Sequence, residues 1–247
     1  MSSGGRLDPG ALAYETVAER YESGRPGYQP HLVERVRELF IEGGAEVVVD
    51  LAAGTGKFTR ALATADALVI AIEPVSAMAR QLMSVVDGVQ AVRGLAGGIP
   101  LADGSVGSIS VAQAFQWFDQ GDVVEIARVL CPEGVLALVR NNRQDTGDWQ
   151  VLSDVLDPYR TSSARRVDAI GWLEESGDFS DVTVEKWHWT RTLTRAQLHD
   201  HIASLSWIAL LGSDDSDRLH QRIDDLFGSR ERHRLDYVSE LVWARRL

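Results

Sequence analysis

Residues 47 to 63 read VVVDLAAGTGKFTRALA, an apolar run followed by a loop of small residues that contains Gly54 and Gly56. Short runs rich in valine are typical of buried strands, and the pattern after the loop is helical. A strand that turns directly into a helix leaves amide N–H groups unpaired at the positive end of the helix dipole. Because glycine has no side chain to block the approach, this loop is suited to an anion or a closely packed ligand.

An acidic residue follows at the end of the next apolar run. Glu73 closes the stretch ALVIAIE, 23 residues beyond Asp50. In a right-handed βαβ unit the ends of these two strands are neighbours, so the Glu73 carboxylate can accept hydrogen bonds from both hydroxyls of a ribose. The order of strand, turn, helix, strand and acid therefore predicts a nucleoside pocket. The alternative is that the glycines serve only a tight turn and Glu73 is a solvated loop residue.

The elements that would hold these residues alternate between strand and helix patterns, which indicates an α/β fold with a mostly parallel sheet. Short, apolar, β-branched runs predict strands at 47–51, 67–73, 89–94, 107–115 and 134–140, with two later strands at 181–190 and 235–247. Apolar residues at helical spacing predict helices at 29–41, 57–64, 76–86, 122–130, 194–212 and 215–229, and helix-like pieces at 149–159 and 168–177.

Composition and charge narrow the function classes. Apolar residues make up 45% and charged residues 25% of the 247 positions, which is typical of a globular chain. The net charge of −11 and the absence of a Lys/Arg-rich run argue against a nucleic-acid partner. No apolar run approaches a membrane span, and the N-terminus lacks a signal-peptide pattern. The single cysteine, Cys131, lies in an apolar setting and predicts a buried thiol, so we expect a soluble, cytoplasmic protein.

The glycine loop departs from the dinucleotide fingerprint G-x-G-x-x-G, because Thr59 stands in place of the third glycine. Instead, the acidic Asp50 precedes small residues at alternate positions, Ala52, Gly54 and Gly56. This pattern resembles the first motif of class I S-adenosylmethionine-dependent methyltransferases, D/E-x-G-x-G-x-G, with alanine in the first glycine position.

The resemblance extends along the chain. The stretches YETVAERYESGRPGYQP, VRGLAGGIPLADGSVGSISVAQAFQWFD and GVLALVRNNR are similar to the cap segment, the third and fourth strands, and the fifth strand of the small-molecule "methyltransferase type 11" group. The resemblance implies a Rossmann-like, seven-stranded, mostly parallel sheet flanked by helices, with the last strand antiparallel and a helical cap. It implies an N-terminal cap segment at 1–28, a cofactor-binding core at 29–140, a helical cap or insertion with a late sheet strand at 141–230, and the C-terminal strand at 231–247.

The resemblance also implies S-adenosylmethionine as cofactor, S-adenosylhomocysteine as product and no metal. Leu95 and Ala96 would flank the adenine. Arg25, between Gly24 and Pro26, is a candidate to reach the methionyl carboxylate, and the alternative is that it is an ordinary surface arginine. The cofactor-binding residues it implies are Tyr21, Arg25, Asp50, Ala52, Gly54, Thr55, Gly56, Glu73, Pro74, Met78, Leu95, Ala96 and Gln113. Aromatic side chains of the cap segment, and Phe115 and Trp117 after the fourth strand, are candidates to stabilise a sulfonium by cation–π contact.

Three departures from the family pattern bear on catalysis: Gly97, Gly107 and Gln116, the last standing where relatives commonly have histidine. An amide can orient a methyl acceptor but cannot take its proton, so no general base is assigned and Gln116, Trp117 and Asn141 are orienting candidates. At Ala52 we expect ordinary backbone angles that tolerate a methyl group.

These features predict methyl transfer to an oxygen or nitrogen of a small molecule by a monomer or homodimer without nucleic-acid or membrane partners. One alternative is a catalytically degenerate protein that binds S-adenosylmethionine or S-adenosylhomocysteine. Another is a nicotinamide-dependent oxidoreductase, which should carry a Tyr-x-x-x-Lys or comparable dyad that is not found here. His199 and His201 are two positions apart on a predicted helix, so they point in different directions and do not predict a metal site.

Overall fold

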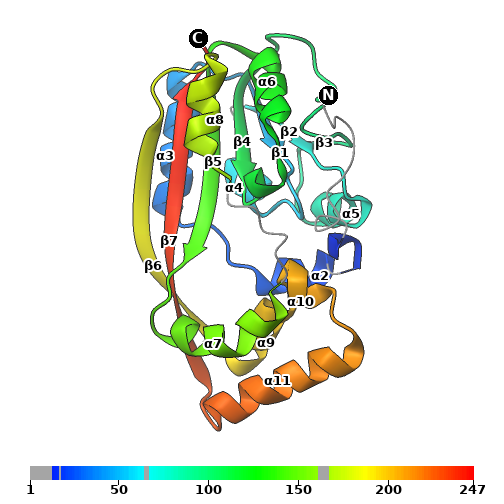
Figure 1. The fold of residues 1–247 in the computed structure, drawn as a ribbon. Coiled ribbons are helices and arrows are strands. Elements are labelled where there is room, and N and C mark those ends of the chain that lie inside the picture. The colour runs from blue at the N-terminus through cyan, green and yellow to red at the C-terminus, as the bar shows by residue number, and fades with distance from the viewer. Residues whose placement is uncertain (1–12, 17, 64–66, 161–166) are drawn as a thin grey trace.

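A computed structural model of the protein describes residues 13–16, 18–63, 67–160 and 167–247, so residues 1–12 of the expected N-terminal cap segment lie outside the described residues. Its centre is a seven-stranded sheet in the order β3-β2-β1-β4-β5-β7-β6 (Figure 1). The strands are β1 Val47–Leu51, β2 Leu68–Ile72, β3 Gln90–Val92, β4 Val106–Ala112, β5 Leu130–Arg143, β6 Thr183–Thr194 and β7 Arg232–Arg245.

Strands β1 to β5 pair in parallel, whereas β7 runs antiparallel to both of its neighbours, β5 and β6. This arrangement confirms the predicted Rossmann-like sheet with an antiparallel last strand. The central strands β1, β2 and β4 are largely buried on both faces, which explains why their sequences are mainly apolar. Their carboxyl ends meet at one edge of the sheet, where ligands bind in folds of this type.

Helices cover both faces of the sheet. Helices α3 Pro30–Glu42, α4 Lys57–Leu62 and α5 Ser76–Val85 pack on one face. Helices α6 Gln120–Val129 and α8 Ala169–Ser176 pack on the other. A capping box fixes the start of α6. The side chain of Asp119 accepts from the backbone N–H of Asp122, and the side chain of Asp122 accepts from the backbone N–H of Asp119.

The strands β5, β6 and β7 are 14, 12 and 14 residues long and extend beyond the shorter strands of the sheet (Figure 1). Their extensions carry a second apolar core, built around the buried side chains of Trp149, Leu198 and Leu235. The helices of this part, named the helical cap here, are α7 Asp148–Leu156, α9 Arg195–Ala203, α10 Ser206–Ala209 and α11 Ser213–Phe227, with the short helix η3 Asp157–Tyr159.

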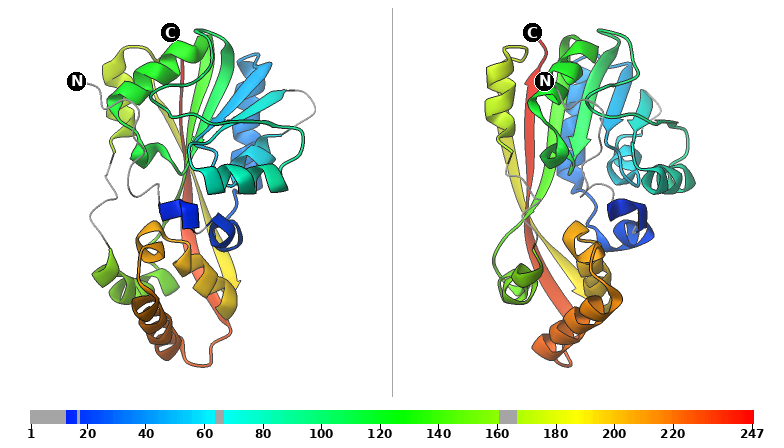
Figure 2. Two further views of the ribbon diagram at one scale, coloured as in Figure 1. Left: turned by 90° about the vertical axis from the view of Figure 1, so that its right-hand side faces the viewer. Right: turned by 45° about the vertical axis from the view of Figure 1, so that its right-hand side comes forward.

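The N-terminal elements η1 Ala13–Thr16 and α2 Ala18–Gly24 lie between the sheet and the helical cap (Figure 2). The short helix η2 Phe115–Trp117 follows the carboxyl end of β4. The carboxyl edge of the sheet is therefore enclosed by three parts of the chain that are distant in sequence.

The predicted helix at 194–212 divides into α9 and α10. Thr194 begins α9 with a capping box, and its end is stabilised where the backbone N–H of Ser204 donates to Asp200 O. The expectation of a buried Cys131 thiol is not met in full, because this residue, the second of β5, is only partly buried. In the part of the chain that the structure describes, no helix has the length and apolar character needed to cross a membrane.

Candidate active site

The loop between β1 and α4 contains two glycines with different roles. Gly54 has φ +60°, and a Cβ atom built there would meet no other atom within 4 Å, so this glycine leaves open space beside the loop. Gly56 has φ +82°, and its Cβ would lie 2.7 Å from Val86 Cγ2 and 2.9 Å from Leu82 Cγ. Gly56 therefore lets the loop pack on α5, whereas Gly54 is the position that a ligand can approach.

The expectation of ordinary backbone angles at Ala52 is wrong. Its φ is +57°, in the left-handed region that disfavours any residue with a Cβ. For an L-amino acid this conformation costs about 1–2 kcal/mol. The loop thus has the backbone shape that glycine favours at this position, and it keeps that shape with alanine.

Asp50 stabilises the base of the loop through side-chain hydrogen bonds. Its carboxylate is fully buried and accepts hydrogen bonds from Thr59 Oγ at 2.6 Å and Ser110 Oγ at 3.0 Å. Burial raises the pKa of Asp50 to about 6, against the lowering effect of these hydrogen bonds. Both oxygen atoms are thereby committed to the protein, and Asp50 connects β1, α4 and β4.

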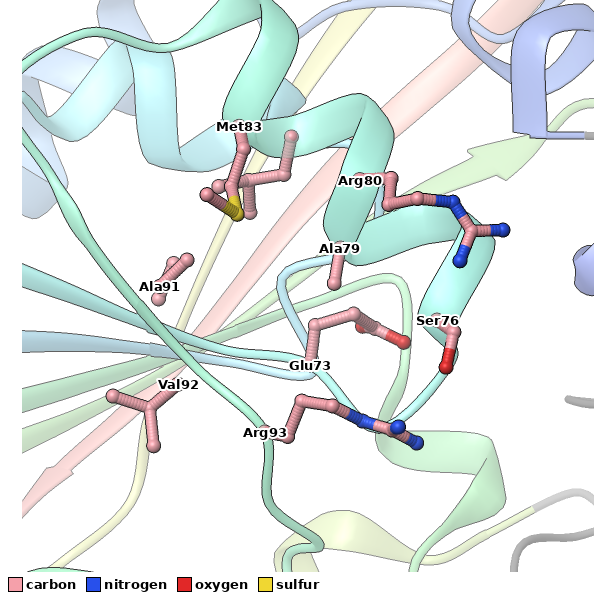
Figure 3. A pocket seen from close by; sticks show the side chains of 10 residues that line it. Glu73, Ser76, Ala79, Arg80, Met83, Ala91, Val92 and Arg93 are labelled. Atoms are coloured by element: carbon pink, nitrogen blue, oxygen red, sulfur yellow. The ribbon is translucent and has the colours of Figure 1, made fainter.

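Glu73 follows β2 and connects the loop to the neighbouring turn. Its two oxygens accept from the backbone N–H groups of Gly54 and Val75, each at 2.8 Å. Burial raises the pKa of this carboxyl to about 7. Glu73 also lines a cavity of about 300 Å³ between α5 and β3, whose walls include Ser76, Met83 and Arg93 (Figure 3).

The N-terminal helices close over this region. Thr55 Oγ donates to Glu22 Oε2 at 2.6 Å, and Arg60 donates to the other oxygen of Glu22 at 3.0 Å. The carboxylate of Glu15 accepts from the backbone N–H groups of Ser76 at 2.9 Å and Ala77 at 3.1 Å, which caps the start of α5.

An apolar cluster adds to these polar contacts. Val75 and Met78 are buried against Ala18 and the rings of Tyr14 and Tyr21, whose centroids lie 5.3 Å apart. Pro74, beside this cluster, accepts a hydrogen bond on its carbonyl from Arg93 at 2.9 Å. Leu95 and Ala96 lie in the loop after β3, where Leu95 forms a β-bridge with Gly98 and Ala96 packs against the sheet core.

A larger cavity of about 540 Å³ lies at the carboxyl ends of β4 and β5, between α2, η2 and the helical cap. Six residues predicted from the sequence line it: Tyr21, Arg25, Gln113, Gln116, Trp117 and Asn141. The cavity therefore joins residues expected to bind a cofactor with residues expected to orient a substrate. The sequence analysis did not single out five further lining residues, Lys57, Arg143, Trp149, Arg160 and Tyr237, and it considered His201 only as a metal ligand.

Comparison with known proteins identifies the family. Residues 49–138 match the methyltransferase domain family. The chain is 32% identical over 218 residues to the uncharacterized methyltransferase-like protein C25B8.10 of Schizosaccharomyces pombe, covering 86% of this chain and 85% of that protein. It is 34% identical over 203 residues to the uncharacterized methyltransferase Mb3374 of Mycobacterium bovis, covering 80% and 78%.

The chain belongs to the class I S-adenosylmethionine-dependent methyltransferases. The fold is shared with YcgJ of Bacillus subtilis, with a TM-score of 0.57, 18% identity and coverage of 88% of this chain and 99% of that one. It is also shared with a candidate type II methyltransferase from Anaeromyxobacter dehalogenans, with a TM-score of 0.67, 19% identity and coverage of 90% and 97%.

Two predicted orienting residues of this methyltransferase are partly or fully engaged by the protein. Gln116 Nε2 donates to Gln113 O at 2.7 Å, which leaves the Gln116 amide oxygen to accept a hydrogen bond in the cavity. Asn141 Nδ2 donates to Gly27 O at 3.1 Å, and Asn141 Oδ1 accepts from Ser239 Oγ at 2.6 Å. Asn141 therefore ties the end of β5 to the segment after α2, with both ends of its amide occupied.

The methyltransferase also carries a buried polar pair that no local sequence signal indicated. The ring of His201 donates from Nδ1 to Gly24 O at 3.0 Å and accepts at Nε2 from the hydroxyl of Tyr237 at 3.2 Å. Burial, with the nearby Arg25, lowers the pKa of His201 to about 3. Burial raises the pKa of Tyr237 to about 12. Both groups are therefore neutral near pH 7, and His201 is a weak base because its pKa is low and its Nε2 already accepts from Tyr237.

His199 lies apart from the cavity and contacts His220 and Asp224 instead. Among the described residues, no group of three or more His, Cys, Asp and Glu side chains is arranged to hold a metal ion.

Proposed function

We propose that this methyltransferase transfers the methyl group of S-adenosylmethionine to an oxygen or nitrogen atom of a small molecule held in the 540 Å³ cavity, with S-adenosylhomocysteine as the second product. The observation that carries the proposal is that one cavity is lined both by Tyr21, Arg25 and Gln113 and by Gln116 and Trp117. Its volume lies within the range of about 300–1,000 Å³ that is usual for small-molecule sites. The helical cap and the N-terminal helices enclose it and are proposed to select the acceptor.

The residues present fit the cofactor. Arg25 donates from Nη2 to Ser204 O at 3.1 Å, but its Nε is buried without a hydrogen-bond partner. An unpaired buried donor on a guanidinium is costly, and a carboxylate such as that of the methionyl group would satisfy it. Gly54 supplies the open approach on the other side, and Glu73 supplies acceptor oxygens for the ribose hydroxyls. Met78, Leu95 and Ala96 are proposed to contact the adenine.

When bound, S-adenosylmethionine supplies an electrophilic methyl group. The chain's own contribution is to align the acceptor with that group and to exclude water, and alignment alone can supply about 7–11 kcal/mol. The amide oxygen of Gln116 can accept from an acceptor, and the rings of Tyr21 and Trp117 line the same space. Helix α2, fixed to the loop by Glu22, is the element that excludes water.

The two alternatives have less support. The comparisons match methyltransferases, and nothing in the described residues favours a nicotinamide enzyme. One departure from the family pattern has a packing cause rather than being a sign of degeneracy. A Cβ on Gly107 would lie 2.6 Å from Ala45 Cα, so this position in β4 requires glycine. Calorimetry with S-adenosylmethionine, S-adenosylhomocysteine and NAD tests the cofactor, and we expect binding of the first two only. Tighter binding of NAD would contradict the proposal, and a methyl-transfer screen separates an enzyme from a binder.

A further inference from the structure

The larger cavity carries charge of a single sign. Its lining includes the cationic side chains Arg25, Lys57, Arg140, Arg143 and Arg160, and the described residues that line it include no aspartate or glutamate. The whole chain, by contrast, has a net charge of −11. A concentration of positive charge in the cavity of an acidic protein favours an anionic occupant, because a cleft with low-dielectric walls focuses the field of its charges.

Several of these cations lack a close carboxylate partner. Arg140 forms no ion pair with a described residue, and Glu240, its partner across the strands, pairs with Lys186 at 2.9 Å. Arg143 lies 3.8 Å from Asp145 and 4.0 Å from Asp157, at the limit of an ion pair. Both acids are exposed, so they neutralise the guanidinium weakly.

Arg160 Nη2 lies 3.5 Å from Oδ1 of Asp157, the same carboxylate that Arg143 approaches. Lys57 Nζ lies 3.5 Å from Glu22 Oε1. If Arg25 binds the methionyl carboxylate, Arg140, Arg143 and Arg160 are left for the acceptor. Three guanidinium groups disfavour an amine acceptor, because an amine is itself cationic near neutral pH.

Neither His201 nor Gln116, which both line this cavity, is suited to remove a proton from an acceptor. The neutral ring of His201 has both nitrogens hydrogen-bonded, because Nδ1 donates to Gly24 O and Nε2 accepts a hydrogen bond from the hydroxyl of Tyr237. Gln116 can only accept a hydrogen bond through its amide oxygen. An alcohol or phenol acceptor would need its proton removed, whereas a carboxylate is already ionised near pH 7.

We infer that the methyl acceptor is a small-molecule carboxylate, bound by Arg140 and Arg143 and methylated on oxygen to a methyl ester. This inference rests on the proposed function and names its acceptor class. A carboxylate oxygen attacks the methyl carbon, the new C–O bond forms as the S–C bond breaks, and the electron pair of that bond goes to sulfur. The products are a neutral methyl ester and S-adenosylhomocysteine, and no proton has to move. The indole rings of Trp117, Trp149 and Trp207 in the lining suit an apolar remainder of the acid.

The test compares acids with amides of the same size. The protein is incubated with S-adenosylmethionine labelled in its methyl group and with hexanoate, phenylacetate or succinate, or with the matching amide. We expect label to enter the acids and to be released as methanol by mild alkali, because esters hydrolyse there and N-methyl or ether products do not. Alkali-stable label would overturn the inference while leaving the proposed function in place. Absence of transfer to every acid would also overturn the inference, and the methyl-transfer screen tests the proposed function separately.

Binding without turnover gives a second readout. The tryptophans of the cavity should report hexanoate through a change in fluorescence, and hexanamide should bind at least tenfold more weakly. Arg140→Gln should weaken hexanoate binding by about tenfold or more, and Arg140→Lys should restore part of it. Arg222→Gln, on the exposed side of α11 and outside the cavity, is the matched control. Equal affinity for hexanoate and hexanamide, or an Arg140→Gln variant that binds hexanoate normally, would exclude a carboxylate subsite.

Discussion

The hydroxyl of Thr55 donates to the carboxylate of Glu22 at 2.6 Å and so joins the glycine loop to helix α2. The other end of α2 is joined to the helical cap, because Gly24 O accepts from Arg191 at 2.7 Å and from His201 at 3.0 Å. One short helix thus connects the proposed cofactor site to the proposed acceptor site. A Cβ on Gly24 would lie 2.4 Å from Asp200 O, so the close approach of α2 to α9 requires glycine.

Glu22→Ala should loosen α2 without unfolding the sheet. The substitution removes a charge-assisted hydrogen bond to a buried threonine and the contact with Arg60, and such a bond contributes about 1.5–3 kcal/mol. We expect faster amide exchange in residues 18–24 and faster dissociation of S-adenosylmethionine. Glu19→Ala, at an exposed position of the same helix, is the control. Unchanged exchange in α2 would mean that Glu22 does not hold it.

Glu73 should make cofactor binding depend on pH. Burial raises the pKa of this carboxyl to about 7, and only the ionised form can accept two ribose hydroxyls while it also accepts from Gly54 and Val75. Affinity for S-adenosylmethionine should therefore rise with pH, by up to about tenfold between pH 6 and 8. Calorimetry at several pH values measures this rise. It should be absent in Glu73→Gln and retained in Asp87→Asn, which changes an exposed carboxylate.

The same carboxyl should affect the stability of the cofactor-free protein in the opposite direction. Its pKa in the folded state is higher than the ordinary value, so the folded state binds the proton more tightly. The resulting stabilisation is fully present below the unfolded pKa, about 4.3, and is lost as the pH rises through about 7. Denaturant titrations should show that the free energy of unfolding falls less between pH 5 and 8 in Glu73→Gln than in the parent. An equal fall in both proteins would rule out this linkage.

Ala52→Gly should stabilise the protein. The residue adopts φ +57°, which costs alanine about 1–2 kcal/mol, while glycine in the unfolded chain costs about 0.4–1 kcal/mol of entropy. We expect a net gain of about 0.5–1 kcal/mol in the free energy of unfolding, measured by denaturant titration. Ala53→Gly, at the next position, has no positive φ to relieve and should destabilise. A loss of stability in Ala52→Gly would show that the methyl group makes contacts worth more than the strain.

Gln116→Ala should lower turnover much more than affinity for S-adenosylmethionine. The side chain is held against Gln113 O and presents its amide oxygen to the cavity, so its removal affects the orientation of the acceptor. Steady-state kinetics with an identified acceptor, together with cofactor calorimetry, separates the two effects. Gln120→Ala, at an exposed position at the start of α6, is the control. Loss of cofactor binding instead would make Gln116 a cofactor residue.

The sequence by itself determined the fold and the local framework of the site. Asp50, the glycine loop and Glu73 belong to one strand-turn-helix-strand unit, and neighbours in such a unit are fixed by short-range periodicity and by the handedness of the crossover. Even there the sequence left the loop geometry open, because Ala52 has φ +57° although the left-handed region is unfavourable for alanine.

Only the tertiary structure decided the character of the larger cavity. Arg25 follows helix α2, Arg140 lies in strand β5 and His201 lies in helix α9. These segments are far apart in sequence and meet because β5, β6 and β7 extend past the sheet to carry the helical cap. Arginine and histidine follow no periodicity that marks a site. Whether the Asn141 amide is free or engaged depends on Gly27, between α2 and α3, and on Ser239, within β7. Side chains acquire this shared environment through long-range packing, which the pattern of neighbouring residues does not encode.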